Sequence, residues 1–442
     1  MEAAIADLPR ERTELLANLG RLRPLTPEVA DALADHMRIR RGDVHEVVSF
    51  YSYLREPLDR QLVCTGPICD SLGATVPPGA LAVPCLGRCE HGGAAGPHVA
   101  NDGPSIGLLS PDWPRPAPWL ASDTVLAELR SSGLTGYGGA GFPTWRKWEA
   151  VRAQPGPRVV VVNGDEGEPG TFKDRYVMEL RPQLLLEGLE AAMRFLDADH
   201  ALIYIREEYG LAIERVEHAV AERGIAARIV RGAGSYVCGE ETALLESLEG
   251  RRGEPRLKPP FPAEHGYLGM PTLVQNVETL AHVPAILRFG GRRWPRTRLW
   301  SVSGCVARPG CYEAPVDTSL RSLLELAGGA TEELGAIVPG GAASGILPPS
   351  ALDDFGSGSG AVQFFPASHP VEQLLATTLH FFAEESCGKC APCRLGTRAL
   401  LRHGELAPER LEDVMAAMEE LSICGLGQSA PKPLRDVLEH WR

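Results

Sequence analysis

The cysteines carry the most evident chemistry in this sequence. Cys387, Cys390 and Cys393 form a C-x2-C-x2-C pattern, and Cys424 follows in the segment SICGLGQ. Three thiolates at this spacing can grip one face of a [4Fe–4S] cube, whose fourth ligand must then come from elsewhere in the chain. Cys424 is the only nearby candidate. Zinc is the alternative metal, but three closely spaced thiolates with one distant partner favour the cube.

A second group of four cysteines lies near the N-terminus. Cys64 and Cys69 form a C-x4-C pair, and Cys85 and Cys89 form a C-x3-C pair fifteen residues later. A short apolar run precedes each pair, so we expect a strand leading into each. Four thiolates can hold a [2Fe–2S] cluster or a structural zinc, because both accept tetrahedral sulfur. A vestigial, empty site is the third alternative.

A glycine-rich stretch, Gly133–Trp148 (GLTGYGGAGFPTWRKW), holds five glycines. Glycines this dense let the backbone adopt positive φ and bring its N–H groups close to a bulky anion. Pro143 suits the first turn of a helix, and helix N-termini bind phosphates readily. No strong strand precedes Gly136, so the stretch is not the usual dinucleotide fingerprint. A flexible surface loop is the alternative.

The next segment favours a nucleotide site. Arg158–Val162 (RVVVV) predicts a buried parallel strand, and an acidic loop with Asp165, Glu166 and Glu168 follows it. Ligands of open α/β sheets bind at the carboxyl ends of strands. These carboxylates would repel a phosphate but could accept hydrogen bonds from ribose or ribityl hydroxyls. We therefore expect the glycine-rich loop on the phosphate side of a pocket and the acidic loop on its hydroxyl and ring side; a solvated acidic turn is the alternative.

Composition sets wider limits. The chain has 442 residues, enough for about three domains, and a hydrophobic fraction of 44% that is typical of globular proteins. The net charge of −13 argues against nucleic acid as a partner. We find no apolar run long enough for a membrane span and no signal segment, so we expect a cytoplasmic protein without direct membrane insertion. Eleven cysteines in a reducing compartment usually indicate metal binding.

The elements that would position these residues alternate between strand and helix. We expect strands at Ala201–Ile205 and Ala227–Val230, and helices at Leu184–Leu196 and Glu207–Arg223. Such alternation predicts a parallel, Rossmann-like sheet. The loop Gly232–Thr242 then falls at another carboxyl end, where it could line the same pocket.

The flanking segments predict further modules. Three helical patterns precede Tyr53, one of them capped by Thr26, and Ser122 is expected to cap a helix running through Leu129. A hairpin around Arg308–Gly310 begins a small β-grasp module, and four helices fill the C-terminal part. The fold class is therefore α/β multidomain: 1–55 N-terminal helical bundle, 56–110 compact cluster domain, 111–121 linker, 122–298 Rossmann-like core, 299–366 β-grasp module and 367–442 four-helix iron–sulfur domain.

Several motifs in a fixed order resemble one known family. They are GYGGAGFPT with the KW pair, VNGDEGEPGTFKDR, GSYVCGEETALLESLEG, LKPPFPAEHGYLGMPTLVQNVETL and ESCGKCAPCRLGT. Together they resemble the NADH- and FMN-binding flavoprotein subunit of respiratory complex I and its soluble relatives, from about residue 122 to the C-terminus. The N-terminal cysteines, CLGRCE in particular, resemble the thioredoxin-like [2Fe–2S] subunit. The chain thus resembles a fusion of the two subunits, with a shortened [2Fe–2S] part, and the resemblance favours [2Fe–2S] over zinc there.

The resemblance implies a set of site residues. Glu168 and Glu241 are the expected catalytic residues, with Glu241 near the ribose of the dinucleotide. The expected FMN and NAD(H) contacts are Gly136, Gly138, Gly139, Phe142, Lys147, Asn163, Asp165, Glu166, Tyr236, Gly239, Glu240, Lys258, Phe261, Gln275, Asn276 and Val277. The expected cluster ligands are Cys387, Cys390, Cys393 and Cys424 for [4Fe–4S], and Cys64, Cys69, Cys85 and Cys89 for [2Fe–2S].

Two departures from the family pattern affect this pocket. Ala150 stands where the family often has an aromatic residue, so one side of the pocket offers less surface for stacking a ring of the nucleotide. Gln275 stands in place of an asparagine, so its amide is one methylene further from the backbone. Of the other cysteines, we expect Cys238, Cys305 and Cys311 to be packing residues.

These features predict a diaphorase. A flavin exchanges two electrons with nicotinamides and single electrons with clusters, so we expect hydride transfer between NAD(H) and FMN and then electron transfer through the [4Fe–4S] cluster. By resemblance, the partner is the catalytic subunit of a soluble formate dehydrogenase or hydrogenase. A complex I-type or electron-bifurcating module is the alternative, and an iron–sulfur scaffold that has lost its flavin is a further one. Glu241 predicts NAD(H) over NADP(H), because a carboxylate repels the 2′-phosphate.

Overall fold

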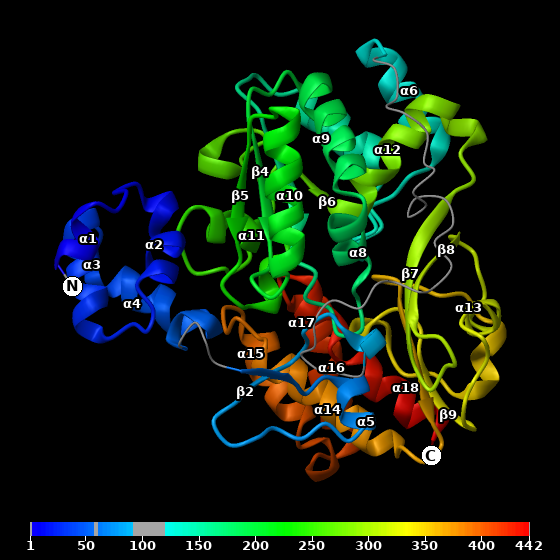
Figure 1. Cartoon of the computed structure of the whole chain (residues 1–442). Coiled ribbons are helices and arrows are strands. Elements are labelled where there is room, and N and C mark those ends of the chain that lie inside the picture. The colour runs from blue at the N-terminus through cyan, green and yellow to red at the C-terminus, as the bar shows by residue number, and fades with distance from the viewer. Residues whose placement is uncertain (1, 57–60, 92–119, 442) are drawn as a thin grey trace.

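The computed structural model describes residues 2–56, 61–91 and 120–441. Its centre is a four-stranded parallel sheet in the order β5-β4-β3-β6 (Figure 1). The predicted strands are present, and the fourth was not foreseen from the sequence. The bounds are β3 Val159–Gly164, β4 Ala201–Ile205, β5 Ala227–Arg231 and β6 Thr272–Asn276.

The sheet is buried on both faces. Val160 and Val162 belong to one hydrophobic cluster, whereas Val159 and Val161 belong to another, as expected when successive side chains point to opposite faces. The first cluster lies under α9, α10 and α12, and the second contacts α11 and the N-terminal helices. These helices are α9 Pro182–Leu196, α10 Gly210–Arg223, α11 Glu241–Leu248 and α12 Val277–Phe289.

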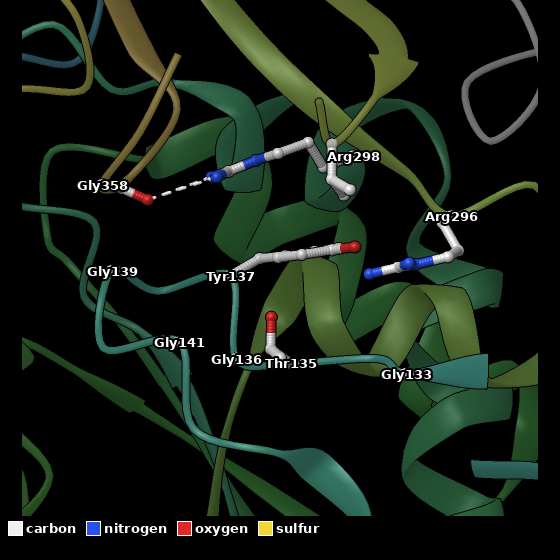
Figure 2. Close-up of a pocket in the computed structure, with 10 residues that line it drawn as sticks. Gly133, Thr135, Gly136, Tyr137, Gly139, Gly141, Arg296, Arg298 and Gly358 are labelled. Atoms are coloured by element: carbon white, nitrogen blue, oxygen red, sulfur yellow. Dashed lines mark hydrogen bonds between the residues drawn. The ribbon is translucent and has the colours of Figure 1, made fainter. Parts of the chain in front are cut away.

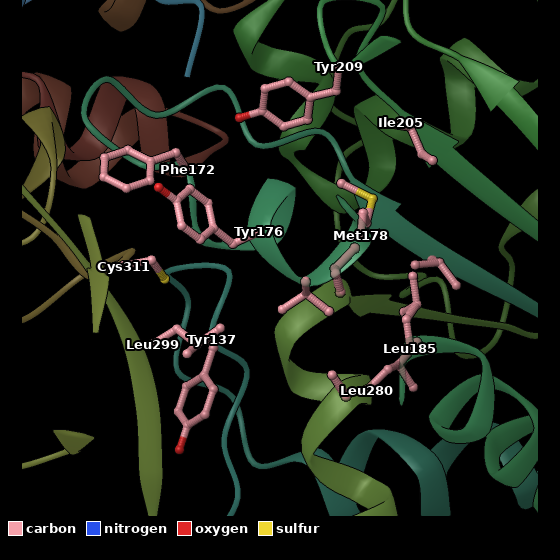
Figure 3. Packing of buried hydrophobic residues seen from close by; sticks show 14 of the residues in the cluster. Tyr137, Phe172, Tyr176, Met178, Leu185, Ile205, Tyr209, Leu280, Leu299 and Cys311 are labelled. Carbon is pink, nitrogen blue, oxygen red and sulfur yellow. The ribbon is translucent and has the colours of Figure 1, made fainter. Parts of the chain in front are cut away.

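Three more helices surround the strand ends. They are α6 Ser122–Ser132, α7 Thr144–Arg152 and α8 Lys173–Leu180. The expectation that Ser122 caps α6 is wrong, because Ala121 occupies the cap position without a side-chain bond and the helix extends to Ser132. Figure 3 shows part of the main hydrophobic cluster, in which Cys311 of the predicted β-grasp module lies beside Phe172 and Tyr176. Cys311 is fully buried there, in agreement with its predicted packing role.

The N-terminal bundle has four helices rather than the three predicted. They are α1 Glu2–Ala6, α2 Leu15–Arg21, α3 Pro27–Met37 and α4 Arg41–Phe50. Thr26 accepts a hydrogen bond from the Val29 N–H, so the predicted cap is confirmed. Helix α4 ends at Phe50, and a short 3-10 turn over Ser52–Arg55 follows.

The N-terminal cysteines lie on a small parallel unit. Strands β1 (Leu62–Cys64) and β2 (Leu81–Val83) pair side by side, and α5 (Pro67–Ser71) lies between them in the chain. Both strands lead into a cysteine pair, as predicted. The end of the predicted cluster domain and most of the predicted linker lie outside the described residues.

The next module is a four-stranded mixed sheet in the order β8-β7-β10-β9. The predicted hairpin is the antiparallel pair β7–β8, and β10 runs parallel to β7 and antiparallel to β9. One helix, α13, follows the hairpin and begins at a Ser319 cap. The bounds are β7 Thr297–Gly304, β8 Gly310–Pro315, α13 Leu320–Leu326, β9 Leu334–Val338 and β10 Ala361–Pro366.

The C-terminal part contains five helices, one more than predicted. The additional one, α17, is a short helix directly after Cys424. The bounds are α14 Val371–Glu384, α15 Ala391–Leu400, α16 Pro408–Leu421, α17 Gly425–Ser429 and α18 Lys432–His440. Within the described ranges, no helix has both the length and the apolar character needed to cross a bilayer.

Candidate functional site

The glycine-rich loop is an open turn that leads into α7. Thr135 and Pro143 form an isolated antiparallel bridge at its base. Gly139 and Gly141 have φ angles of +111° and +63°, and a Cβ at either position would meet open space. Pro143 is the N-cap of α7 rather than its first residue. The loop therefore presents exposed backbone beside a helix N-terminus, which suits an anionic ligand.

The three acidic side chains of the next loop point to different partners instead of forming one repulsive cluster. Glu166 accepts hydrogen bonds from the backbone N–H groups of Asp174 and Arg175, at 2.9 and 3.2 Å, and from the Tyr209 hydroxyl at 3.1 Å. Burial raises the pKa of Glu166 to about 8. This carboxylate is thus occupied within the protein, and its contribution to the pocket is to fix the loop on α8.

Asp165, unlike Glu166, has a carboxyl oxygen without a hydrogen-bond partner in the described part of the chain. Its Oδ2 is buried and has no hydrogen-bond partner among the described residues. Burial raises its pKa to about 8, against the opposing charge of Arg206. Neighbouring Asn163 donates from Nδ2 to the Gly239 carbonyl at 2.8 Å and so ties two predicted pocket loops together. An unpartnered carboxyl oxygen at a strand's carboxyl end is what a bound group with N–H or O–H donors would satisfy.

Glu168 connects three modules. It accepts hydrogen bonds from the Tyr236 hydroxyl at 2.5 Å and from the Ala343 N–H at 2.9 Å. The Tyr236 ring packs edge-on against Phe381, and its N–H donates to Glu385. Burial raises the pKa of Glu168. This side chain therefore holds the acidic loop, the tyrosine loop and the β9–β10 module in one arrangement.

Two lysine–glutamate pairs form another wall. Lys147 Nζ lies 2.7 Å from Glu241 Oε2, and Lys258 Nζ lies 2.8 Å from Glu240 Oε1. Although burial acts to raise it, the pKa of Glu241 is lowered because Lys147 favours the charged form. Glu240 also caps α11 by accepting from two backbone N–H groups. Exposed Phe142 (48%), together with Phe261 (52%), provides apolar faces suited to stacking a planar ring.

Three predicted site residues, Gln275, Asn276 and Val277, lie at the end of β6 or directly after it, and that strand was not predicted. Asn276 caps α12 and donates from Nδ2 to Asp174 at 2.7 Å, and Gly138 lies against its side chain. Gln275 is buried and its Oε1 has no hydrogen-bond partner among the described residues. Val277 is fully buried in the core. Gln275 Oε1 is thus a second buried acceptor without a hydrogen-bond partner in the described ranges.

Two buried cations were missed by the sequence analysis. Lys173 lies 2.8 Å from Asp174 and 3.1 Å from Glu278, in the first turn of α8. Arg206 donates to the carbonyl oxygens of Cys85 and Glu166. Arg206 directly follows β4, so its place at a strand's carboxyl end was the signal that could have identified it.

The C-terminal cysteines gather around the start of α15 and α17. Cys387, Cys393 and Cys424 are buried, and Cys390 is half-buried. Cys424 is the N-cap of α17, where backbone N–H groups of that helix favour its thiolate, although burial raises its pKa to about 11. The predicted fourth ligand is thus brought to the other three by an element that the sequence did not reveal.

The cluster loop adjoins the predicted flavin loop. Cys387 packs in one apolar cluster with Val237 and Ala243, which flank the predicted contacts Gly239 and Glu240. Arg252 donates to the Cys387 carbonyl, and Lys389 pairs with Glu254 at 3.0 Å. The two predicted redox sites therefore share a packed boundary.

The N-terminal cysteines lie against the other side of the acidic loop. All four thiols are buried, and the neighbouring Cys69 and Cys85 thiols raise the pKa of Cys64. Arg175 donates to the Gly87 carbonyl at 3.0 Å. The cysteine unit is thus docked on the residues that follow β3.

Across the described ranges, no three His, Cys, Asp or Glu side chains are grouped so that they could hold a metal ion. The four C-terminal thiols nevertheless lie close enough to affect one another electrostatically.

Comparisons with known proteins agree with this geometry. Residues 129–285 match the family model described as the Nuo51 FMN-binding domain, residues 300–346 the SLBB domain, and residues 373–442 the NADH-ubiquinone oxidoreductase-F iron-sulfur binding region. An NADH-quinone oxidoreductase subunit of Rhizobium meliloti is 42% identical over 367 residues, covering 72% of this chain and 87% of that protein. The chain belongs to the Nuo51 family of NADH-quinone oxidoreductases. It is therefore of the NADH-dependent oxidoreductase class, with an FMN-binding domain and a 4Fe–4S binding region.

Other relatives give the same result. The NADH-quinone oxidoreductase subunit of Streptomyces coelicolor is 39% identical over 369 residues, covering 73% of this chain and 82% of that one. Among solved structures, a chain of an NAD+-reducing [NiFe]-hydrogenase superposes with a TM-score of 0.86 at 31% identity. This superposition covers 98% of this chain and 93% of the hydrogenase chain. The predicted family and the predicted 4Fe–4S and FMN groups are thus confirmed.

Proposed function

We propose that this protein is the diaphorase subunit of a soluble complex and passes electrons between NAD(H) and a partner enzyme. Bound FMN would supply the exchange between a two-electron hydride carrier and one-electron centres. The observation that carries the proposal is the packing of Cys387 against Val237 and Ala243. This contact supports electron exchange between the proposed cluster loop and the proposed flavin loop, because fast electron transfer requires the two groups to be close.

The chain's own residues would hold the nicotinamide nucleotide from several sides. Phe142 and Phe261 offer exposed rings on which the adenine can stack. Lys258 lies close enough to both Glu240 and Glu241 to balance their charges, at 2.8 and 3.8 Å. Glu241 would accept a hydrogen bond from the ribose 2′-hydroxyl, and this favours NAD(H) over NADP(H).

The flavin would satisfy the polar groups that lack partners. Asp165 Oδ2 and Gln275 Oε1 are buried acceptors without protein donors among the described residues, and the glycine-rich loop supplies open backbone. Glu168 would position Tyr236 and the loop beside the flavin. These unsatisfied acceptors also weigh against a scaffold that has lost its flavin, since such a protein would gain stability by replacing them.

We further propose that Cys64, Cys69, Cys85 and Cys89 hold a [2Fe–2S] cluster in a shortened, fused domain. The burial of all four thiols and the hydrogen bonds from Arg175 to the Gly87 carbonyl and from Arg206 to the Cys85 carbonyl support this role. Zinc is the alternative. Iron and acid-labile sulfide should exceed the content of one [4Fe–4S] cluster, and Cys85→Ser should remove the excess. One zinc per chain at this site would contradict the assignment.

For the partner, we propose the catalytic subunit of a hydrogenase or a formate dehydrogenase, and a cytoplasmic location. The superposition on a hydrogenase chain covers 98% of this chain, whereas the alignments with the two NADH-quinone oxidoreductase relatives cover 72% to 73%. The higher identity to those relatives keeps a complex I-type module as the second candidate. No nucleic-acid partner is expected at a net charge of −13.

Affinity purification of the native complex with metal analysis tests the partner. Nickel with iron would indicate a hydrogenase, molybdenum or tungsten a formate dehydrogenase, and membrane subunits a complex I-type assembly. Flavin fluorescence after heat release tests the core of the proposal. A chain purified with full iron content but without any flavin would contradict the diaphorase function.

A further inference from the structure

A cavity of about 220 Å³ lies between the glycine-rich loop and the start of β7 (Figure 2). Gly139 and Gly141 line it from the loop, Arg296 and Arg298 from the start of β7, and Gly358 from the β9–β10 connection. Pockets for drug-sized ligands are usually larger, at roughly 300–1,000 Å³. The cavity is therefore suited to a small ligand and not to a dinucleotide.

Arg298 is a buried cation whose closest acidic influence is buried Glu278, with which it forms no ion pair among the described residues. Its side chain is only 7% exposed and lies between the rings of Tyr137 and Trp300, at 5.1 and 4.6 Å from their centroids. Its Nη atoms donate to the Gly358 carbonyl at 3.3 Å, and its Nε has no partner. No carboxylate of the described residues lies within 4.0 Å of it. Glu278 is already paired with Lys173 at 3.1 Å, so the Arg298 guanidinium can accept a further anion.

A second arginine stands at the rim of the same cavity. Arg296 is exposed, and its guanidinium forms no hydrogen bond or ion pair within the described part of the chain. Its φ of +52° is uncommon for a residue other than glycine. Such backbone conformations persist where the surrounding structure imposes them, often at ligand sites. Figure 2 shows its side chain directed toward Tyr137.

We propose that this cavity is a binding site for a small oxyanion of the phosphate class. Arg298 would provide the buried charge and Arg296 the charge at the rim. The site is distinct from the proposed flavin and nucleotide pocket, because Lys147, Glu241 and the other charged or amide side chains proposed for that pocket do not line it. Only glycines of the loop belong to both the cavity and the proposed flavin pocket. An oxyanion in the cavity would therefore stabilise the glycine-rich loop from the side opposite to Asn276.

Titration calorimetry of the flavin-loaded full chain with inorganic phosphate in a chloride buffer tests the proposal. We expect saturable binding of one phosphate per chain. A charge-assisted hydrogen bond contributes about 1.5–3 kcal/mol, so Arg298→Gln should weaken phosphate binding about tenfold or more. Arg296→Gln, at the solvent-exposed rim, should weaken it about threefold.

Arg293→Gln is the matched control, because it removes the same charge from an exposed arginine outside the cavity. It should leave phosphate binding unchanged. If Arg298→Gln does not fold, Arg296→Gln alone decides the question, since that side chain has no protein partner in the described residues. Absence of saturable binding to the parent protein, or an equal loss with Arg293→Gln, would overturn the proposal.

The oxyanion could also be the phosphate tail of the flavin. Binding of FMN and of riboflavin, which lacks the phosphate, to the flavin-free chain distinguishes the two sources. A separate site requires that Arg298→Gln change both affinities by the same factor. A selective loss of FMN affinity would overturn the separate site and assign Arg298 to the flavin phosphate. Because the phosphate titration does not depend on electron transfer, its result is independent of the proposed diaphorase function.

Discussion

Lys147 and Glu241 form an ion pair of 2.7 Å between helices that begin far apart in the chain. Lys147 lies on α7 after the glycine-rich loop, and Glu241 begins α11 after the tyrosine loop. Lys147 also donates to the Val274 carbonyl at 3.2 Å. The lysine therefore keeps Glu241 ionised at the mouth of the proposed nucleotide pocket, and this charge is what should exclude a 2′-phosphate.

Replacing Glu241 by Gln should shift cofactor preference. The change keeps the size of the side chain, removes the negative charge and releases Lys147 from its ion pair, so that Lys147 can attract a phosphate. We expect kcat/KM with NADPH to rise about tenfold, the equivalent of ~1.4 kcal/mol, and kcat/KM with NADH to fall about threefold or less. Glu420→Gln, at an exposed position of α16, is the control. A parent protein that uses NADPH as efficiently as NADH would refute the assignment.

Replacing Cys387 by Ser should remove the [4Fe–4S] cluster and leave the flavin bound. The serine hydroxyl is a poor ligand for iron, so the low-potential cluster signal in electron paramagnetic resonance should disappear, whereas FMN should remain bound. Reduction of an artificial dye by NADH at the flavin should largely survive. Cys305→Ser, which removes a buried thiol of the β7–β10 module, should leave the cluster signal intact. Persistence of the signal after replacement of all three C-x2-C-x2-C cysteines would show that the cluster lies elsewhere.

Asp165 should make the flavin-free protein sensitive to alkaline pH. Burial raises its pKa to about 8, whereas an unfolded aspartate titrates near ~3.9. Arg206 opposes this shift, while Glu208 and Glu385 reinforce it. Because the folded pKa lies above the unfolded one, the contribution of this group to stability is full below about pH 4 and is lost as pH rises to about 8.

Asp165→Asn removes that loss. Chemical denaturation should show that the free energy of unfolding of the variant rises relative to that of the parent protein by roughly 3 kcal/mol between pH 6 and pH 9. Glu166 has the same raised pKa in both proteins and cancels in the comparison. Asp413→Asn, at an exposed position of α16, should show no such trend. A difference between Asp165→Asn and the parent that is constant with pH would be inconsistent with this origin.

Gly87 should be required for docking of the N-terminal cysteine unit. Its φ is +62°, and a Cβ there would overlap the hydroxyl of Tyr209, which itself donates to Glu166. Gly87→Ala should destabilise the unit by roughly 1–3 kcal/mol and increase hydrogen exchange at residues 85–89. Gly73→Ala shares the positive φ of +75° but meets open space, so it isolates backbone strain from the clash. Equal effects of the two substitutions would show that the contact with Tyr209 is not needed.

Features that depend on local spacing could be predicted from the residues alone. The cysteine patterns, the β-branched run at Val159–Val162 and the loops after strands are local in the chain, and their chemistry follows from residue type and period. Strand β6 was not predicted, because Thr272–Asn276 has only two strongly apolar residues and ends in two amides. The short helix α17 was missed for a similar reason, since five residues are too few to show a helical period.

The tertiary structure alone decided which charges meet. Lys173 joins Asp174 with Glu278, and Arg206 joins the cysteine unit to the acidic loop, across separations that no local pattern encodes. It also decided that Asp165 keeps an unpartnered oxygen while Glu166 is fully hydrogen-bonded, although the two are adjacent in sequence. Neighbouring carboxylates differ in this way because burial and hydrogen-bond partners depend on the packed surroundings, which only the complete fold supplies.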